Sequence, residues 1–281
     1  MSVRTVEELV AKMQKIVDIW QPGTRHGNQG EAGHTLEDLL GIKENNLKLP
    51  DFGDVEIKTQ KAEGKDNLLT LFHKEPTSVC GQAAVPQLLK AMGWKHQKAG
   101  TGTGYPHDEK SFRSTTSGNA YTPRGFTIQC TKDKLSFIFD PTKIATKNAD
   151  ETRVYPTYGD WLEDINNRKT VDGKNPDYQR IFPVYYNLGC LQEIFETKLN
   201  HTLLVYYKKK KDKAGKNLYW YDEAYLLKTV RMNQIPQLID DGSLVLDFDA
   251  RTHHNHGTKL RVKKSKAKDL FTEFEMMDKG K

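Results

Sequence analysis

Three acidic residues and one lysine lie within the segment PDFGDVEIK, residues 50–58. The end of this segment alternates as a strand does, so Glu56 and Lys58 share one face while Val55 and Ile57 face the core. A pair of carboxylates supplies hard oxygen ligands for Mg²⁺, which takes phosphate oxygens as further ligands. A neighbouring ammonium can position an attacking water and stabilise charge on phosphorus. The segment therefore carries the groups that hydrolysis of a phosphodiester needs.

The first carboxylate of this set has two candidates. Asp54 shares the alternating face with Glu56 and Lys58, whereas Asp51 reaches that face only if the following Phe-Gly pair folds it back in a turn. The alternation alone favours Asp54. A solvated amphipathic strand is the competing interpretation, because strands of this pattern are common and short motifs match by chance.

The region before this segment is predicted to contain a helix and a glycine-rich loop. Thr5 and Glu8 form a capping box, and apolar residues at helical spacing predict a helix over 5–20 that Pro22 stops. Three glycines within residues 25–33 disfavour regular structure and allow close approach of the backbone.

A second helix is predicted directly after this loop. Thr35 is its expected cap, and its buried stripe consists of Leu36, Leu39 and Leu40. Glu37 follows Leu36 and lies beside that stripe, so we expect its carboxylate near the edge of the core.

The rest of the chain mixes strand and helix patterns. Strands are predicted at 54–59, 68–72, 126–130, 135–139, 201–207, 217–221, 244–248 and 259–262, and helices at 83–92, 158–167, 187–199 and 231–240. Residues 95–125 and 141–157 are predicted to be rich in loops, which often bind ligands. This mixture indicates an α/β or α+β sheet, in two lobes.

Composition narrows the class of protein. The chain has 281 residues, 36% hydrophobic and 28% charged, with 12 Tyr, 11 Phe and 4 Trp, which excludes a small disulfide-stapled scaffold and a disordered chain. No apolar run approaches the roughly 20 residues of a membrane helix, and the N-terminus lacks a signal-peptide pattern. Cys80, Cys130 and Cys190 are odd in number and widely spaced. We expect a soluble, cytoplasmic protein with reduced thiols.

Positive charge is concentrated in the last third of the chain. The formal net charge of +6 is only a weak indication of a polyanionic partner. A run of four lysines, Lys208 to Lys211, lies between two predicted strands, with Gly215 in the turn. A solvated hairpin tip and a phosphate-binding segment both fit this run.

Several segments, taken in order, resemble a known nuclease family. GNQG at 27–30, TLEDLL at 35–40, PDF at 50–52, EIKT at 56–59 and LLTLF at 68–72 resemble the catalytic core of the MvaI/BcnI restriction endonucleases. TSGN at 116–119 and HNHGTKLR at 254–261 resemble later segments of the same family. The likeness covers most of the chain and is patchy at about 80–110 and 141–185.

This resemblance implies a fold. Family members have a restriction-endonuclease-like PD-(D/E)xK core, of the α/β (α+β) class, which they share with the mismatch-repair nickase MutH. A mixed central sheet and two lobes around a DNA cleft are expected. By this resemblance residues 1–145 form mainly the catalytic lobe and residues 146–281 mainly the DNA-recognition lobe, and the lobes can interleave.

The resemblance also implies an active site. It assigns Asp51, Glu56 and Lys58 as the catalytic set, with Asp51 and Glu56 holding Mg²⁺ and Glu37 as an accessory acid. Asp51 is favoured over Asp54 here because the family's metal-binding acid directly follows the proline of the motif. Double-stranded DNA is the implied substrate.

The histidine-rich segment 253–256 has three interpretations. A zinc site has no cysteine partner at ligand spacing, and the letters HNH resemble HNH nucleases only superficially. Base recognition is the third, because His and Asn present donors and acceptors and Arg261 can bind guanine through two hydrogen bonds. The resemblance favours base recognition, and the expected DNA-binding residues are Asn28, Asn119, Asp247, Arg251, His254, Asn255, His256 and Arg261.

One departure from the family concerns a recognition strand. The family carries an Asp-x-Arg pair there, whereas this chain reads Asp247-Phe248-Asp249. The loop that follows is shorter, and Arg251 is one candidate for the missing guanidinium. The resemblance therefore predicts a short GC-containing target without its exact sequence.

The expected function is that of a bacterial or archaeal type II restriction endonuclease. By resemblance it would act as a monomer, need Mg²⁺, leave 5′-phosphate ends, and have a cognate DNA methyltransferase as a genetic partner. One alternative is a MutH-like nickase of mismatch repair, which would act at hemimethylated GATC sites. Another is a non-cleaving DNA-binding protein, which would have no need of Lys58 beside two acids.

Overall fold

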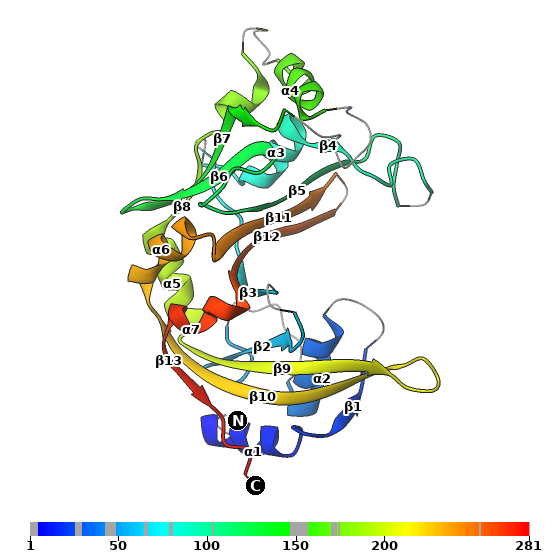
Figure 1. The fold of residues 1–281 in the computed structure, drawn as a ribbon, viewed down its shortest axis with the longest axis vertical. Helices are drawn as coiled ribbons and strands as arrows, with labels where there is room; N and C mark the ends of the chain where they lie inside the picture. Colours follow the sequence, from blue (N-terminus) through cyan, green and yellow to red (C-terminus); the bar gives the residue numbers. More distant parts are fainter. Residues whose placement is uncertain are drawn as a thin grey trace. The chain divides into compact units, whose positions relative to one another are not determined.

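The computed structural model of this chain describes residues 5–25, 30–42, 49–64, 67–78, 81–102, 104–146, 157–169, 173, 175–252 and 254–280. The chain forms two compact units, drawn in Figure 1. Unit 1 contains Met1–Leu69, Leu191–Met232 and Lys263–Lys281, and unit 2 contains Thr70–Cys190 and Asn233–Val262. The units therefore interleave along the sequence, and residue 145, the predicted end of the first lobe, lies within the first segment of unit 2.

The sheet of unit 1 is mixed. Its strands are β1 (Trp20–Pro22), β10 (Asn217–Val230), β9 (His201–Lys211) and β2 (Val55–Lys61) in that order, and β13 (Phe271–Met276) also pairs with β10. Only the β2–β9 pair of this sheet is parallel. β9 and β10 form the long hairpin coloured yellow in Figure 1. The hairpin turn at residues 212–216 carries the predicted Gly215 with φ near 80°.

Two helices cover one face of this sheet. α1 (Val6–Gln14) buries Leu9 and Met13, and α2 (Glu31–Leu40) buries Leu36 and Leu40. These side chains join a core cluster with Ile57 of β2, Leu203 and Val205 of β9, and Tyr219 and Tyr221 of β10. The apolar stripes therefore fix α2 against the strand that carries Glu56. The remaining helices of this part are α5 (Leu188–Lys198), α7 (Ala267–Leu270) and the 3-10 turn Lys264–Lys266.

Both N-terminal helix predictions need correction. The first helix ends at Gln14 rather than at residue 20, because Trp20 pairs with Trp220 in the sheet and its ring lies 5.5 Å from that ring. The second helix begins at Glu31 with Gly30 as its cap, not at Thr35. Thr35 is buried inside the helix, where its hydroxyl accepts a hydrogen bond from the Thr24 backbone N–H. Sheet pairing and burial override the local signals in both cases.

Unit 2 contains two antiparallel assemblies of strands. The first has the order β3 (Leu68–His73), β12 (His254–Lys263), β11 (Leu244–Arg251), β5 (Lys110–Thr116) and β4 (Trp94–Lys95). The second has the order β6 (Arg124–Cys130), β7 (Lys134–Ile144) and β8 (Val184–Asn187). Phe112, Phe126, Phe137 and Phe248 pack between them with ring centroids 4.6–6.3 Å apart. β5 lies in the region that the sequence predicted to be rich in loops.

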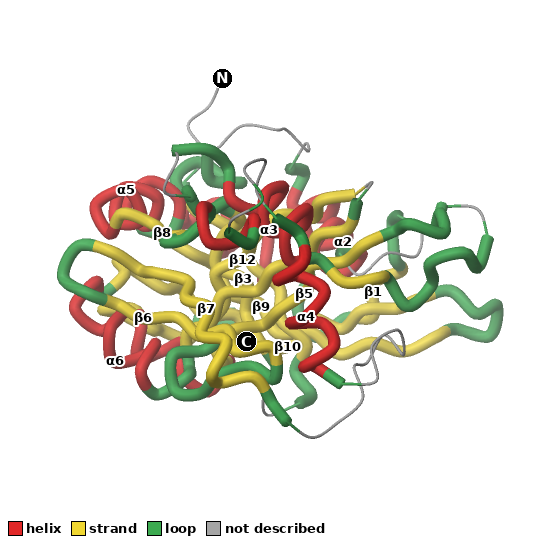
Figure 2. The backbone as a smooth tube through the Cα atoms, turned by 90° about the horizontal axis from the view of Figure 1, so that it is seen from above, coloured by secondary structure: helices red, strands yellow, loops and turns green. Residues whose placement is uncertain are grey.

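The helices of unit 2 lie closer to their predicted residue ranges than the two N-terminal helices do. They are α3 (Ala84–Met92), α4 (Tyr158–Asn167), α6 (Ile235–Asp240) and the 3-10 turns Asp177–Arg180 and Met232–Gln234. α4 begins at the capping box of Thr157 and Asp160. Figure 2 shows helices and strands in both units, as expected for an α+β protein. Among the described residues no helix is long and apolar enough to cross a membrane.

Candidate active site

A tight turn brings Asp51 back onto strand β2. Phe52 and Val55 exchange two backbone hydrogen bonds of 2.9 Å, with Gly53 between them at φ near 62°. A positive φ of this size suits glycine, which has no Cβ to clash. The Asp51 carboxylate then accepts a 2.9 Å hydrogen bond from the backbone N–H of Ile57. The fold-back on which the Asp51 prediction depended is therefore present.

Glu56 and Lys58 lie together on one face of β2. Glu56 is only 2% exposed, and its Oε1 is 2.5 Å from Lys58 Nζ. Val55 and Ile57 face the core cluster, as the alternation predicted. The strand thus presents a buried carboxylate and a partly buried ammonium in direct contact.

A second lysine reaches the same carboxylate. Lys198, the last residue of α5, places its Nζ 3.5 Å from Glu56 Oε1. Sequence analysis missed Lys198, which lies outside any local motif. Its contact depends on the fold, because β9, which runs parallel to β2, begins three residues later, and its Thr202 pairs with Glu56. The end of the preceding helix must therefore lie beside the beginning of β2.

The electrostatics of Glu56 favour a bound cation. Burial is the main cause that raises the pKa of Glu56, the charge of Asp51 adds to it, and Lys58 and Lys198 only partly oppose it. The Glu56 Oε2 atom is buried and has no hydrogen-bond partner within the described part of the chain. A buried, unbonded carboxylate oxygen is costly unless something binds it. A hard divalent cation fits this position, and Mg²⁺ needs only one or two carboxylates because it keeps waters and takes substrate phosphate oxygens.

Asp54 has a different environment from Asp51. Its side chain is 64% exposed and lies 2.6 Å from the Nδ1 atom of His201, the first residue of β9. The charge of Asp51, in contrast, adds to the effect of burial in raising the pKa of Glu56. The structure therefore brings Asp51, Glu56 and Lys58 together and leaves Asp54 at the rim.

Two acids of α2, Glu37 and Glu31, have different surroundings. Glu37 is half-buried, and it is one of the minor contributors, after burial, to the raised pKa of the Tyr221 hydroxyl. Glu31, which sequence analysis did not single out, is 5% exposed and accepts hydrogen bonds from the Tyr219 hydroxyl and the Asn217 amide. Glu31 therefore ties the start of α2 to β10 and positions the helix that carries Glu37.

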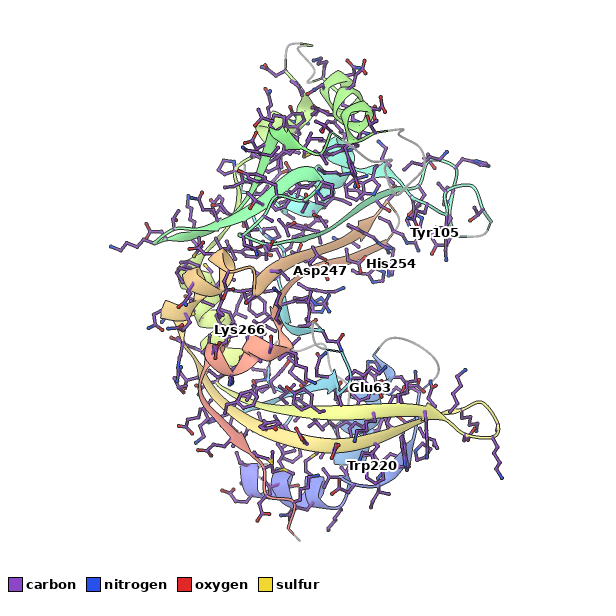
Figure 3. The ribbon with its side chains drawn as sticks, in the orientation of Figure 1. Glu63, Tyr105, Trp220, Asp247, His254 and Lys266 are labelled. Carbon is purple, nitrogen blue, oxygen red and sulfur yellow. The ribbon has the colours of Figure 1, made fainter. Side chains whose placement is uncertain are left out.

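A second polar cluster lies in unit 2, on the outward face of strands β5, β11 and β12. Asp247 accepts from Arg261 at 2.8 Å and from the Thr115 hydroxyl at 2.8 Å. Asp249 contacts Arg113 at 2.9 Å and Lys259 at 3.2 Å. We call these six residues the polar face; Asp247 on β11 is labelled in Figure 3. Buried Leu246, Phe248 and Ala250 alternate with the two aspartates and face the core.

The other residues expected to bind DNA have varied contacts. Arg251 donates to the Gly104 carbonyl at 2.8 Å and to Glu109 at 3.1 Å, which ties β11 to the loop that contains Tyr105 (Figure 3). Asn119 donates to the Asp241 carbonyl at 3.3 Å in a loop contact. Asn28 lies outside the described residues. These contacts do not by themselves bring Arg251 or Asn119 to the polar face.

The histidine segment begins β12 and is largely exposed. His254 and His256 pack with ring centroids 4.2 Å apart, and Asn255 accepts from the Gly257 backbone N–H. Burial is the largest cause that lowers the pKa of His256, so its ring is neutral near pH 7 and offers one donor and one acceptor. Within the described residues no three His, Cys, Asp or Glu side chains are grouped so as to hold a metal.

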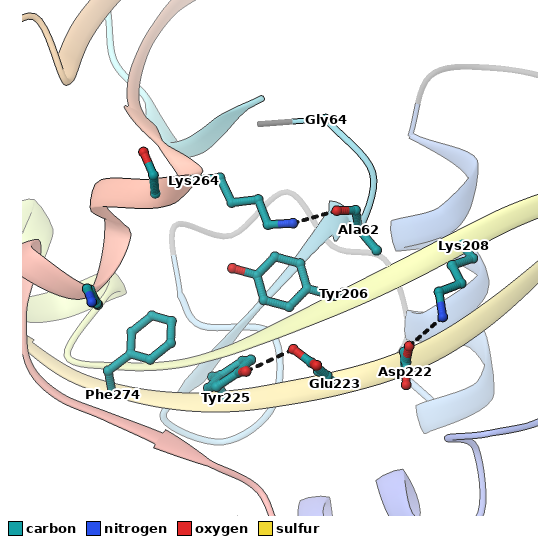
Figure 4. Close-up of a pocket in the computed structure, with 11 residues that line it drawn as sticks. Ala62, Gly64, Tyr206, Lys208, Asp222, Glu223, Tyr225, Lys264 and Phe274 are labelled. Atoms are coloured by element: carbon teal, nitrogen blue, oxygen red, sulfur yellow. Dashed lines mark hydrogen bonds and ion pairs between the residues drawn. The ribbon is translucent and has the colours of Figure 1, made fainter. Parts of the chain in front are cut away.

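The lysines of the run Lys208 to Lys211 make different contacts. Lys208 pairs with Asp222 at 2.8 Å, while Lys209 lies over the ring of Tyr219 and Lys210 over that of Trp20. Lys208 also borders a cavity of about 690 Å³ lined by Tyr206, Tyr225, Phe274, Lys264 and Lys268 (Figure 4). Figure 4 shows that Lys264 already donates to the Ala62 carbonyl and that Glu223 accepts from Tyr225. Neither Asp51 nor Glu56 lines this cavity.

Comparison with known proteins identifies the architecture. The chain is similar to the solved "Restriction endonuclease MvaI-cognate DNA substrate complex", with a TM-score of 0.72, 25% sequence identity, and coverage of 97% of this chain and 98% of that chain. It also matches "Restriction endonuclease MvaI in the absence of DNA" at 25% identity and a TM-score of 0.49, with coverage of 99% of both chains. No curated protein gives a significant match.

A family model extends this likeness to the sequence. The model of the MvaI/BcnI restriction endonuclease family matches residues 10–271, which include β2, the polar face and the histidine segment. The fold is therefore restriction-endonuclease-like, as the sequence predicted. The chain belongs to the MvaI/BcnI restriction endonuclease family.

Proposed function

We propose that this restriction endonuclease hydrolyses double-stranded DNA with Mg²⁺ at a short, GC-containing site and leaves 5′-phosphate ends. The observation that carries the proposal is the buried Glu56, whose Oε2 has no hydrogen-bond partner in the described part of the chain, beside Asp51 and Lys58. Two carboxylates and an ammonium at this spacing are the parts of a metal-assisted phosphodiesterase.

In this proposal Asp51 and Glu56 hold the metal. When bound, Mg²⁺ would supply a Lewis acid for the phosphate oxygens and a lowered pKa for the attacking water. Lys58 Nζ, which already donates to Glu56, orients the water and stabilises negative charge on the phosphate. The attacking water loses a proton to solvent as its oxygen bonds to phosphorus, the bond between phosphorus and the 3′ oxygen breaks, and that oxygen takes a proton from solvent. The products carry a 5′-phosphate and a 3′-hydroxyl.

Recognition of the site is assigned to unit 2. Arg261, held by Asp247, has the fork that binds O6 and N7 of guanine, and His254, Asn255 and His256 lie on the exposed start of the same strand. Arg251 supports the neighbouring loop through Glu109 in this proposal, and a DNA contact from it stays a prediction. The similarity to a restriction endonuclease solved in complex with its cognate DNA supports DNA as the ligand.

The proposal extends to the setting of the enzyme. We place it in the cytoplasm of a bacterium or archaeon, as a monomer, with a cognate DNA methyltransferase encoded nearby. Membership of a restriction endonuclease family supports this setting, because a restriction enzyme requires protection of the host's own sites.

Digestion of a supercoiled plasmid of known sequence tests the function. With Mg²⁺ we expect fragments that end at one short GC-containing site with 5′-phosphates, and no cleavage when EDTA replaces Mg²⁺. Nicks confined to hemimethylated GATC sites would instead establish the mismatch-repair alternative. Tight binding without cleavage in Mg²⁺ would establish a non-cleaving DNA-binding protein.

A further inference from the structure

Two acid–arginine pairs occupy consecutive outward positions of strand β11. Asp247 contacts Arg261 of β12, and Asp249 contacts Arg113 of β5. The register places Asp249 directly opposite Arg113, so both side chains lie on the same face of the sheet. The polar face therefore presents two guanidinium groups, one from each neighbour of β11.

On a surface proposed to meet DNA, the two aspartates need a structural role, because a carboxylate repels phosphate. Each one holds cationic partners: Asp247 Oδ2 accepts from Arg261, and Asp249 contacts Arg113 with Oδ1 and Lys259 with Oδ2. A side chain fixed in this way is suited to reading a base, since specificity requires a rigid donor geometry. In both pairs, an aspartate of β11 therefore contacts an arginine of a neighbouring strand.

Arg113 is the most accessible of the three arginines in this region. Its side chain is 50% exposed, compared with 27% for Arg261 and 19% for Arg251. Arg251 is engaged with Glu109, whose side chain is fully buried, and with the Gly104 carbonyl. Lys259 shares Asp249 but carries a point charge, which cannot form the two parallel hydrogen bonds of a guanidinium.

We propose that Arg113, held by Asp249, reads a guanine of the target site in the major groove and supplies the guanidinium that β11 itself lacks at this position. Arg113 and Arg261 then read two different guanines from opposite neighbours of one strand. This inference rests on the proposed function, because it presumes a specific DNA site. It adds β5 to the recognition surface, a strand that the sequence patterns did not predict.

The test begins with the site mapped by wild-type digestion. Binding is measured in Ca²⁺, without cleavage, to a duplex with this site and to duplexes in which each base pair is changed singly or each guanine is replaced by 7-deazaguanine. For Arg113→Ala we expect discrimination at one guanine position to fall roughly 5- to 150-fold, with discrimination at the other positions retained. Arg113→Lys keeps the charge and should lose the same discrimination, and Asp249→Asn should weaken it at the same position.

Arg180→Ala is the matched control, because Arg180 is an arginine of unit 2 with a 57% exposed side chain and an acidic partner, Asp177. It should keep the wild-type profile, and melting curves should show that all variants fold. A phosphate contact gives a different result: Arg113→Ala would weaken every duplex alike and flatten the salt dependence, while Arg113→Lys would bind as wild type. That result, or an unchanged profile in Arg113→Ala, overturns the inference and leaves the proposed function intact. A wild-type enzyme that cuts no DNA overturns both.

Discussion

Strand β2, which carries the proposed catalytic residues, and the polar face both combine acidic and basic residues, but the pKa of the central acid is shifted in opposite directions. On β2, burial is the main cause that raises the pKa of Glu56, the charge of Asp51 adds to it, and the Lys58 and Lys198 ammoniums oppose it only in part. On the polar face, Asp249 has a lowered pKa: burial acts against this, but Lys259 and then Arg113 outweigh it. The β2 cluster therefore contains a buried carboxylate with a raised pKa, whereas the polar face contains an aspartate with a lowered pKa.

This difference distinguishes two roles of acidic residues, which are to bind a metal ion and to hold basic side chains in place. A buried carboxylate whose charged form is disfavoured is stabilised by a bound cation. On the polar face, both carboxylate oxygens of Asp247 and of Asp249 already have partners and hold those side chains in place, whereas Glu56 Oε2 has no partner in the described part of the chain. The contrast predicts that substitutions on β2 change catalysis and metal dependence, whereas those on the polar face change specificity.

The largest effect is expected for Glu56. Glu56→Gln keeps the shape and removes the charge, so Mg²⁺-dependent cleavage should fall by at least roughly 100-fold, while specific DNA binding in Ca²⁺ is largely kept. Lys58→Ala should lose cleavage likewise. The measurement is single-turnover cleavage of a site-containing duplex. Glu63→Gln is the control, because Glu63 lies just beyond the end of β2 with a 68% exposed side chain and should retain wild-type cleavage. Full activity in Lys58→Ala would contradict the catalytic assignment.

Next in size is the effect of Arg261 on specificity. Arg261→Ala should reduce the ratio of specific to non-specific affinity by roughly 5- to 150-fold, because one bidentate guanine contact is lost. His256→Ala should lower the same ratio. The concentration of Mg²⁺ that supports half-maximal residual cleavage should not change in either variant. A shift in that concentration without a loss of specificity would show that the polar face serves the metal site instead.

The pH profile should reveal the raised pKa of Glu56. A metal ion binds the ionised carboxylate, so cleavage at low Mg²⁺ should fall as the pH drops through a value above the ordinary 4.5. Raising Mg²⁺ should move this acid limb to lower pH, because the metal competes with the proton. Lys198→Met removes a charge that lowers the pKa, so its acid limb should lie at higher pH than that of wild type. An acid limb that is insensitive to Mg²⁺ would argue against Glu56 as a metal ligand.

The smallest effect is expected at the β9–β10 hairpin. If Lys209 and Lys210 contact phosphates, replacing both by Ala should reduce the slope of log affinity against log salt by about 0.9 per lost contact. If they only cover Tyr219 and Trp20, the slope should stay unchanged and the melting temperature should fall slightly. Filter binding over a range of salt concentrations distinguishes these results.

The sequence predicted the geometry of the segment from Asp51 to Lys58 better than that of the polar face, for a physical reason. Asp51, Glu56 and Lys58 lie within eight consecutive residues, so one turn and one strand determine their geometry. The polar face joins residues from three strands, with Arg113 and Asp249 more than 100 positions apart. Only the register of the folded sheet reveals that they meet.

The individual errors in the sequence-based predictions have the same physical cause, which is pairing between distant parts of the chain. β5 was predicted as loop because KSFRSTT has few apolar residues, yet Phe112 is fully buried and anchors it. The helix predicted over 5–20 was too long because Trp20 continues the apolar spacing, although its partner is Trp220 in the sheet. Lys198 was missed because its contact with Glu56 depends on the parallel pairing of β2 and β9. Long-range pairing decides each of these cases.

The most direct test of the central claim, that Asp51 and Glu56 together hold the catalytic metal, compares Asp51→Asn with Asp54→Asn. Both substitutions remove one negative charge from the same turn, but only Asp51 lies beside Glu56 in the structure. Single-turnover cleavage in Mg²⁺ should fall by at least roughly 100-fold in Asp51→Asn and stay close to wild type in Asp54→Asn. Full cleavage by Asp51→Asn together with an inactive Asp54→Asn would contradict the account.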